Sequence, residues 1–186
     1  LDPSNADLFV RRARVSVLTE NYTDALDDLL LAKKFNPKNP RTFLYLGQVY
    51  QSLEQVDPAL EALRQALTLN PKYADAHALV AKIQADQGLP EDAIKSYKEA
   101  INSTRYRQER FVVPLAGLLV ALGRSGEAYE ELNRLASEGS QAPDVWFQLF
   151  NASVRTGNLM RAKDALAEFV RLAPASDKIE AMRSQL

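Results

Sequence analysis

A period of about 34 residues runs through this chain and limits what it can fold into. Alanine recurs once per period, at Ala25, Ala59, Ala93, Ala128 and Ala162, with a one-residue insertion between the third and the fourth. Glycine follows the same phase at Gly88, Gly123 and Gly157, with the same insertion. Because independent columns share one phase and one insertion, the chain is predicted to be a repeat protein.

Each repeat predicts a pair of helices. In the second repeat, Phe43, Leu46 and Tyr50 recur at helical spacing. Asp57-Pro58 then opens a second helix, with Asp57 expected as the N-cap and Pro58 at the first helical position. Such a pair cannot bury its apolar face alone, so we expect successive pairs to stack. The sequence therefore predicts an all-α solenoid of antiparallel helix pairs.

The pattern resembles the tetratricopeptide repeat family, through Phe43, Leu46, Gly47, Tyr50, Ala59, Leu63, Ala66 and Pro71 of the second repeat. The resemblance implies a right-handed superhelical solenoid of bacterial type. Its expected units are 6–39, 40–73, 74–108, 109–142 and 143–174, followed by a C-terminal capping helix at 175–186. Residues 1–5 are interpreted as the tail of a preceding repeat, because Pro3 lies one full period before Pro37. We therefore expect the chain to be part of a longer solenoid.

Several residues depart from the family pattern. Arg12 and Ser16 replace apolar or aromatic residues in the first unit, and Ser140 occupies a position where proline recurs. Pro114 falls inside the first helix of the fourth unit, which predicts a late helix start or a kink there. Adjacent acidic residues such as Asp27-Asp28 point to different sides of a helix, so we expect them on the solvated surface.

Catalytic chemistry is disfavoured by composition. The chain has no cysteine and one histidine, so the usual zinc sites and Ser–His arrangements cannot be assembled. His77 lies in a column of large residues, where a packing role is favoured over ligand binding. The sequence predicts a protein that is not an enzyme and has no cofactor or metal.

Charge and hydropathy limit the partners. The formal net charge of -1 argues against a nucleic-acid binder. The basic segment Thr104–Phe111 is interpreted as an exposed junction, with a site for an acidic partner or nucleic acid as the alternative. No apolar run is long enough to cross a bilayer, so direct membrane insertion is not expected.

The family resemblance also implies a partner site. First helices of successive units line a concave groove, and the register carries the groove positions onto this chain. The expected partner-binding residues are Arg14, Arg41, Leu44, Gln48, Lys82, Arg110, Val113, Phe147, Asn151 and Arg155; Val10 holds an equivalent position. A peptide or amphipathic helix would suit them, whereas the alternative is packing against neighbouring repeats or a capping helix. The carboxylate clamp that holds heat-shock chaperone tails is absent, since its positions hold Val10, Arg14, Tyr45, Asp75 and Leu79.

Three functions follow. The first is a non-enzymatic scaffold that binds a protein segment within a larger assembly. The second is a spacer in a longer bacterial envelope protein for exopolysaccharide export or pilus assembly, contacting partners through its ends or convex face. The third is an enzyme-associated or polymer-guiding module. Self-association through the solenoid ends is a further expected interaction. The bacterial periplasm is the favoured compartment, with the cytoplasm as the alternative.

Overall fold

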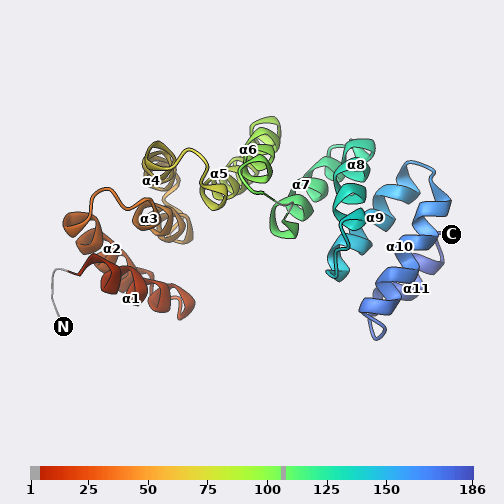
Figure 1. The fold of residues 1–186 in the computed structure, drawn as a ribbon, viewed down its shortest axis with the longest axis horizontal. Helices are drawn as coiled ribbons and strands as arrows, with labels where there is room; N and C mark the ends of the chain where they lie inside the picture. The colour runs from red at the N-terminus through yellow and green to blue at the C-terminus, as the bar shows by residue number, and fades with distance from the viewer. Residues whose placement is uncertain (1–4, 106–107) are drawn as a thin grey trace. The chain divides into compact units, whose positions relative to one another are not determined.

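The computed structural model describes residues 5–105 and 108–186, and all regular secondary structure in these ranges is helical. The helices are α1 (Ala6–Leu18), α2 (Tyr22–Phe35), α3 (Pro40–Ser52), α4 (Val56–Leu69), α5 (Ala74–Asp86), α6 (Pro90–Asn102), α7 (Glu109–Ala121), α8 (Ser125–Ser137), α9 (Pro143–Arg155), α10 (Leu159–Leu172) and α11 (Lys178–Arg183). Within each of the pairs α1–α2, α3–α4, α5–α6, α7–α8 and α9–α10, a short turn joins the two helices and they pack on each other (Figure 1). The predicted all-α fold of helix pairs is confirmed.

The chain divides into two compact units, Leu1–Ser103 and Thr104–Leu186. In the first unit, α1 packs on α2, α3 on α4 and α5 on α6, and each pair contacts the next. In the second unit, α7 packs on α8 and α9 on α10, while α11 rests on α10. The N-terminal residues 1–4, interpreted from sequence as a preceding repeat's tail, lie outside the described residues.

Two expectations about helix starts are wrong. Helix α4 begins at Val56 with Gln55 as its N-cap, so Asp57 lies inside the first turn and caps nothing. Its charge still favours the helix N-terminus there. Helix α7 begins at Glu109 and runs through Pro114, so there is no late start. Asparagine supplies caps elsewhere: the Asn39 side chain accepts a hydrogen bond from the Arg41 N–H at 3.0 Å.

The turns inside the helix pairs share one backbone conformation. Gly88, Gly123 and Gly157 have φ of 73°, 75° and 75°. In the first two pairs the equivalent residues are Glu20 and Glu54, and both have φ of 58°. This left-handed conformation favours glycine, because a Cβ atom crowds the backbone there. The glycine column therefore reflects a turn that recurs in all five pairs, whichever residue occupies it.

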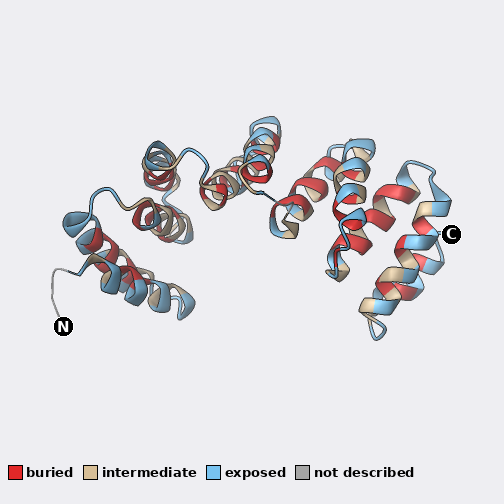
Figure 2. Cartoon of the chain, in the orientation of Figure 1, coloured by how far each residue is buried: buried red, intermediate tan, exposed pale blue. Residues whose placement is uncertain are grey.

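Small residues recur at buried positions in the first four helix pairs. Ala13, Ala25, Ala59, Ala81, Ala93, Ala116 and Ala128 have no exposed surface. Buried residues gather along the helix faces that meet (Figure 2). His77 is half-buried, and its Nε2 atom lies 2.9 Å from the Pro71 carbonyl oxygen. These contacts agree with the packing role expected for the histidine.

An ion pair between an exposed arginine and a buried aspartate corrects one surface assignment. Asp28 is 4% exposed, so it does not belong to the solvated surface. Its carboxylate accepts two hydrogen bonds from the Arg12 guanidinium, one of them from Nε at 2.5 Å. These hydrogen bonds, and next the charge of Asp28, raise the pKa of Arg12. Arg12, which departs from the family pattern, thus forms an ion pair with Asp28 of α2.

Candidate functional site

Within each of the two compact units, the first helices of successive helix pairs contact one another. In the first unit α3 contacts both α1 and α5, and in the second unit α7 contacts α9. Residues at equivalent positions on these helices therefore come close to each other. We call Arg14, Arg41, Leu44, Gln48 and Lys82 the first-helix surface of the first unit. In the second unit, the corresponding residues are Arg110, Val113, Phe147, Asn151 and Arg155.

The first-helix surface of the first unit mixes charged and apolar groups. Arg14, Arg41 and Lys82 are exposed, while Leu44 and Gln48 are half-buried. Exposed cationic side chains and less accessible residues therefore occur together on these contacting helices. Val10, which the register also assigned to the groove, is 3% exposed and belongs to the core. That expectation is wrong, because Val10 packs inward where α1 meets its neighbours.

Arg41 belongs to a small cluster at the start of α3 and α5. Burial raises the pKa of the Tyr73 hydroxyl, and the negative charge of Asp75 adds to this effect. The charge of Arg41, and its hydrogen bond to Tyr73, oppose the rise. Tyr45 also lies close enough to affect the pKa of Tyr73. The cluster gives this edge of the surface a cation, a carboxylate and two phenol groups, all suited to polar contacts with a peptide.

The second unit places its assigned residues differently. Phe147 is half-buried: its ring centroid lies 5.8 Å from that of Phe169 on α10. The Lys178 ammonium, at the start of α11, lies 4.4 Å from the Phe147 centroid. Contacts from α10 and α11 thus cover part of the ring and leave the rest of its half-exposed surface open. Val113 and Asn151 are also half-buried, whereas Arg155 is exposed.

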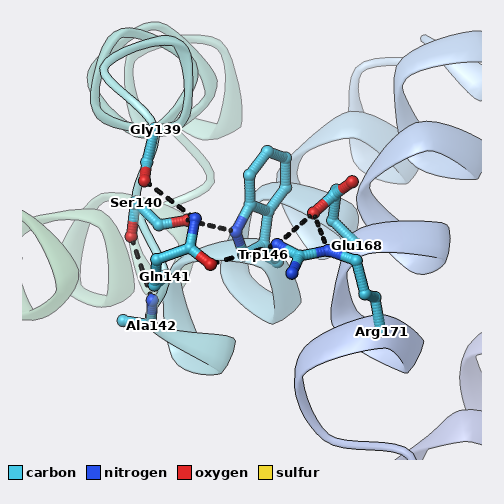
Figure 3. Close-up of polar contacts among 7 residues, drawn as sticks. All are labelled: Gly139, Ser140, Gln141, Ala142, Trp146, Glu168 and Arg171. Atoms are coloured by element: carbon cyan, nitrogen blue, oxygen red, sulfur yellow. Dashed lines mark hydrogen bonds and ion pairs between the residues drawn. The ribbon is translucent and has the colours of Figure 1, made fainter.

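A polar network that the sequence did not predict lies at the turn between α8 and α9. The Trp146 indole N–H donates to the Ser140 carbonyl oxygen at 2.9 Å (Figure 3). The Ser140 hydroxyl donates to the Glu109 carboxylate at 2.5 Å and accepts from the Ala142 N–H at 3.2 Å. The Arg171 guanidinium donates to the Gln141 side-chain oxygen at 3.2 Å. The turn is therefore tied to α7, α9 and α10.

One signal pointed to this turn: Ser140 stands where proline recurs in other units. A proline ring would restrict the backbone at this position. Here the Ser140 hydroxyl holds the turn through hydrogen bonds instead. Beside the turn lies an open cavity of about 780 Å³, lined by residues 108–110, Leu135 and residues 138–141. Arg110 is the one assigned partner-binding residue in its lining. The Arg110 Nε atom donates to the Gln108 side chain at 2.7 Å, and its guanidinium carbon lies 4.6 Å from the Phe111 ring centroid.

A second cavity lies in the first unit, between α2, α3 and α4. Its volume is about 370 Å³, and the buried residues Phe43 and Leu46 contribute to its lining. Leu30 of α2 and Glu61 of α4 also line it, so it opens between two second helices. The Lys33 ammonium lies 5.6 Å from the Phe43 ring centroid. None of these residues is among the predicted partner-binding residues, because that prediction considered first helices only.

Two further features concern metal binding and membrane insertion. In the ranges 5–105 and 108–186, no three His, Cys, Asp or Glu side chains gather in a way that could hold a metal ion. Across the same residues, none of the helices has the length and apolar character needed to cross a bilayer. The basic segment Thr104–Phe111 includes Tyr106 and Arg107, which lie outside the described residues.

Comparison with known proteins supports one family. Residues 44–109 match a model described as tetratricopeptide repeat. Tetratricopeptide repeat protein 28 of Mus musculus is 29% identical over 114 residues, which is 61% of this chain and 5% of that protein. The type IV pilus assembly protein PilF of Pseudomonas aeruginosa is 29% identical over 133 residues. That match covers 70% of this chain and 52% of PilF. The chain thus spans a small part of the first curated relatives it matches.

Solved structures agree on the architecture. The structure of Pseudomonas aeruginosa PilF has a TM-score of 0.78 and 17% identity, covering 97% of this chain and 88% of that one. The first tetratricopeptide repeat domain of Spaghetti, solved bound to an HSP90 peptide, has a TM-score of 0.59 and 19% identity. It covers 66% of this chain and 97% of that one. At these identities, the similarity establishes the fold.

Proposed function

Because this chain belongs to the tetratricopeptide repeat family, whose members generally mediate protein–protein interactions, we propose that it is a non-enzymatic scaffold. Its first-helix surface binds a peptide or an amphipathic helix of a partner protein within a larger assembly. The observation that carries the proposal is the arrangement in the first unit. Exposed Arg14, Arg41 and Lys82 accompany half-buried Leu44 and Gln48 on contacting helices.

This arrangement suits a polypeptide ligand. The half-buried Leu44 provides apolar contact area, and Gln48 can both donate to and accept from a peptide backbone. Arg14 and Lys82 occupy the same repeat position as Gln48, on α1 and α5. Cations at this position favour a segment with carboxylate groups on its flanks. In the second unit, Val113, Asn151 and Arg155 offer a similar mixture, with Arg110 and part of Phe147 beside them.

The peptide-bound Spaghetti structure supports a peptide as the ligand. A heat-shock chaperone tail is not the proposed peptide, because the lysine and asparagine of the carboxylate clamp are missing here. The proposed partner is a protein, without direct contact to nucleic acid and without membrane insertion. The proposal includes no cofactor, and the bacterial periplasm is the proposed compartment, with the cytoplasm as the alternative.

Site-specific photo-crosslinking tests the proposal. A photo-reactive amino acid replaces Gln48, or, as a control, the exposed Asp27 on α2. We expect a partner to be trapped from Gln48 and not from Asp27. A synthetic peptide covering the crosslinked segment is then titrated against the full chain. Combining Arg14→Glu with Lys82→Glu should weaken its binding by roughly tenfold or more, about 1.4 kcal/mol, without changing the unfolding temperature.

Two results would count against this site: crosslinks from Asp27 alone, or an unchanged affinity in the double variant. They would favour the second proposed function, a spacer in a longer bacterial envelope protein for exopolysaccharide export or pilus assembly. The likeness to PilF over 70% of this chain supports that alternative, as does the cavity between α2 and α4. A photo-reactive group at Leu30, which lines this cavity and is 43% exposed, would then trap the partner.

A further inference from the structure

The outer face of α1 differs from the same face of later first helices. Two positions on this face, the third and the tenth of each repeat, are buried wherever a helix pair precedes within the same unit. The third position holds Thr42, Ala76 and Val145, each 0% exposed, and the tenth holds Val49, Ile83 and Ala152, at 0%, 2% and 0%. On α1 these positions hold Leu8, 37% exposed, and Val15, 60% exposed. Two large apolar side chains therefore face solvent.

In the pairs that follow another pair within the same unit, the preceding second helix contacts the first helix that carries this face. Helix α2 contacts α3, α4 contacts α5, and α8 contacts α9. Each of these second helices lies against the following first helix and removes its third and tenth positions from water. The third and tenth positions are therefore buried in three first helices that contact a preceding second helix, and the same two positions are exposed on α1.

Helix α11 of the second unit offers a comparison with α1. Ile179 and Met182 of α11 are buried, at 7% and 1% exposed. The other side of α11 is polar, with an ion pair of 2.8 Å between Arg183 and Glu180. Repeat arrays need such polar outer faces at their ends to stay soluble. The outer face of α1 is less polar than this, since Leu8 and Val15 flank the exposed Arg11 and Arg12 there.

We propose that the outer face of α1 is a stacking surface for one further helix pair of the same kind, joined in series ahead of Asn5. The second helix of that pair covers Leu8 and Val15 with an apolar stripe. Arg12, on the same helix, is compatible with this burial because its guanidinium is already neutralised by the buried Asp28 carboxylate. The sequence register agrees, since Pro3 precedes Pro37 by one full period. This surface is separate from the proposed partner site.

The chain itself provides the probe. A copy of residues 40–73 is placed directly before Ala6, which keeps the period and gives α1 a preceding helix pair. We expect the midpoint of thermal unfolding to rise by roughly 4 °C or more, and amide hydrogen exchange within α1 to slow. Combining Leu8→Glu with Val15→Glu should abolish both effects. In the unextended chain, the same double variant should change the midpoint little, because both side chains are already exposed.

Leu18 provides the matched control. It is 80% exposed, and the equivalent residues Ser52, Asp86, Ala121 and Arg155 are exposed as well, so this position is not covered by stacking. Leu18→Glu should leave the gain of the extended chain intact. An added pair that unfolds separately, with no protection of α1, would overturn the proposal. So would a dimer of the unextended chain that sedimentation detects and that Leu8→Glu abolishes, because a second copy would then cover the face.

Discussion

Gly47 on α3 lies directly against Leu63 on α4. A Cβ atom built on residue 47 would lie 2.6 Å from the Leu63 Cγ atom and 3.3 Å from the Ala59 carbonyl oxygen. Leu63 has no exposed surface, so its side chain has no free space into which to move. Helices α3 and α4 can therefore approach this closely because residue 47 has no side chain.

Gly47→Ala should lower the free energy of unfolding by roughly 1–3 kcal/mol, since the added methyl group overpacks the core. Gly117→Ala is the matched control. Gly117 lies in a first helix at a place where an added Cβ meets no other atom within 4 Å. Removing the backbone freedom of that glycine should raise the free energy of unfolding by about 0.5–1 kcal/mol. Urea unfolding followed by circular dichroism compares the two, and a neutral Gly47→Ala would contradict the packing argument.

Ser140→Ala should lower the free energy of unfolding by about 1–3 kcal/mol, because Ser140 is 8% exposed and the Glu109 carboxylate and the Ala142 N–H each lose a partner. The chain has one tryptophan, Trp146, which bonds to the Ser140 carbonyl oxygen. Its fluorescence therefore reports unfolding of the second unit. Ser137→Ala is the control: that hydroxyl bonds to the Asn133 carbonyl oxygen on the exposed side of α8, so its loss should cost less than about 0.5 kcal/mol.

Two buried hydroxyl groups should be dispensable. The Thr42 and Ser153 hydroxyl oxygens are buried without a hydrogen-bond partner among the described residues. Thr42→Val and Ser153→Ala remove a buried polar group while keeping most of the side-chain shape. Each variant should be as stable as the parent or more stable by about 1 kcal/mol. Thermal unfolding measures this, and a clear loss of stability in either variant would mean that its hydroxyl group is bonded in the folded protein.

Alkaline pH should destabilise the first unit. Burial raises the pKa of Tyr97, and the charge of Asp86 adds to this effect, above the ordinary tyrosine value of 10.0. The unfolded chain therefore releases this proton at a lower pH than the folded chain, so stability falls as pH rises from about 10 toward the raised pKa. Below about pH 10 both the folded and the unfolded chain keep this proton, so Tyr97 does not make the free energy of unfolding depend on pH. Thermal unfolding of the parent and Tyr97→Phe should diverge above about pH 10, with the variant less sensitive; parallel curves would contradict this.

Much of the fold could be predicted from the sequence, because the repeat period places small and large residues at fixed intervals. Gly47 and Ala59 belong to the repeat pattern for this reason. Local chemistry was harder to predict. Asp57 looked like an N-cap from its proline neighbour, but the helix already begins one residue earlier, at Val56. Pro114 predicted a late start or a kink, yet α7 already begins at Glu109 and includes this proline.

Contacts between distant residues could not be predicted at all. Arg12 and Asp28 are 16 residues apart, and either alone looks like a surface residue. Their pairing depends on how α1 and α2 face each other, which the period does not specify. Likewise, the bonds from Ser140 to Glu109 and from Trp146 back to Ser140 join the turn after α8 to α7 and α9. The assigned partner residues depended on family register, which separated Lys82 from the core correctly but misplaced Val10.

Glu20 and Glu54 make one further point about these turns. The last three helix pairs carry glycine where the chain reverses, so their local sequence already favours the required bend. In the first two pairs, the neighbouring helices must hold a glutamate in a conformation it disfavours, at a cost on the order of 1 kcal/mol each. Excised as separate peptides, residues 74–102 should therefore retain a hairpin-like bend more readily than residues 6–35. We therefore expect the turns with glycine to form more readily than the turns with glutamate while the chain folds.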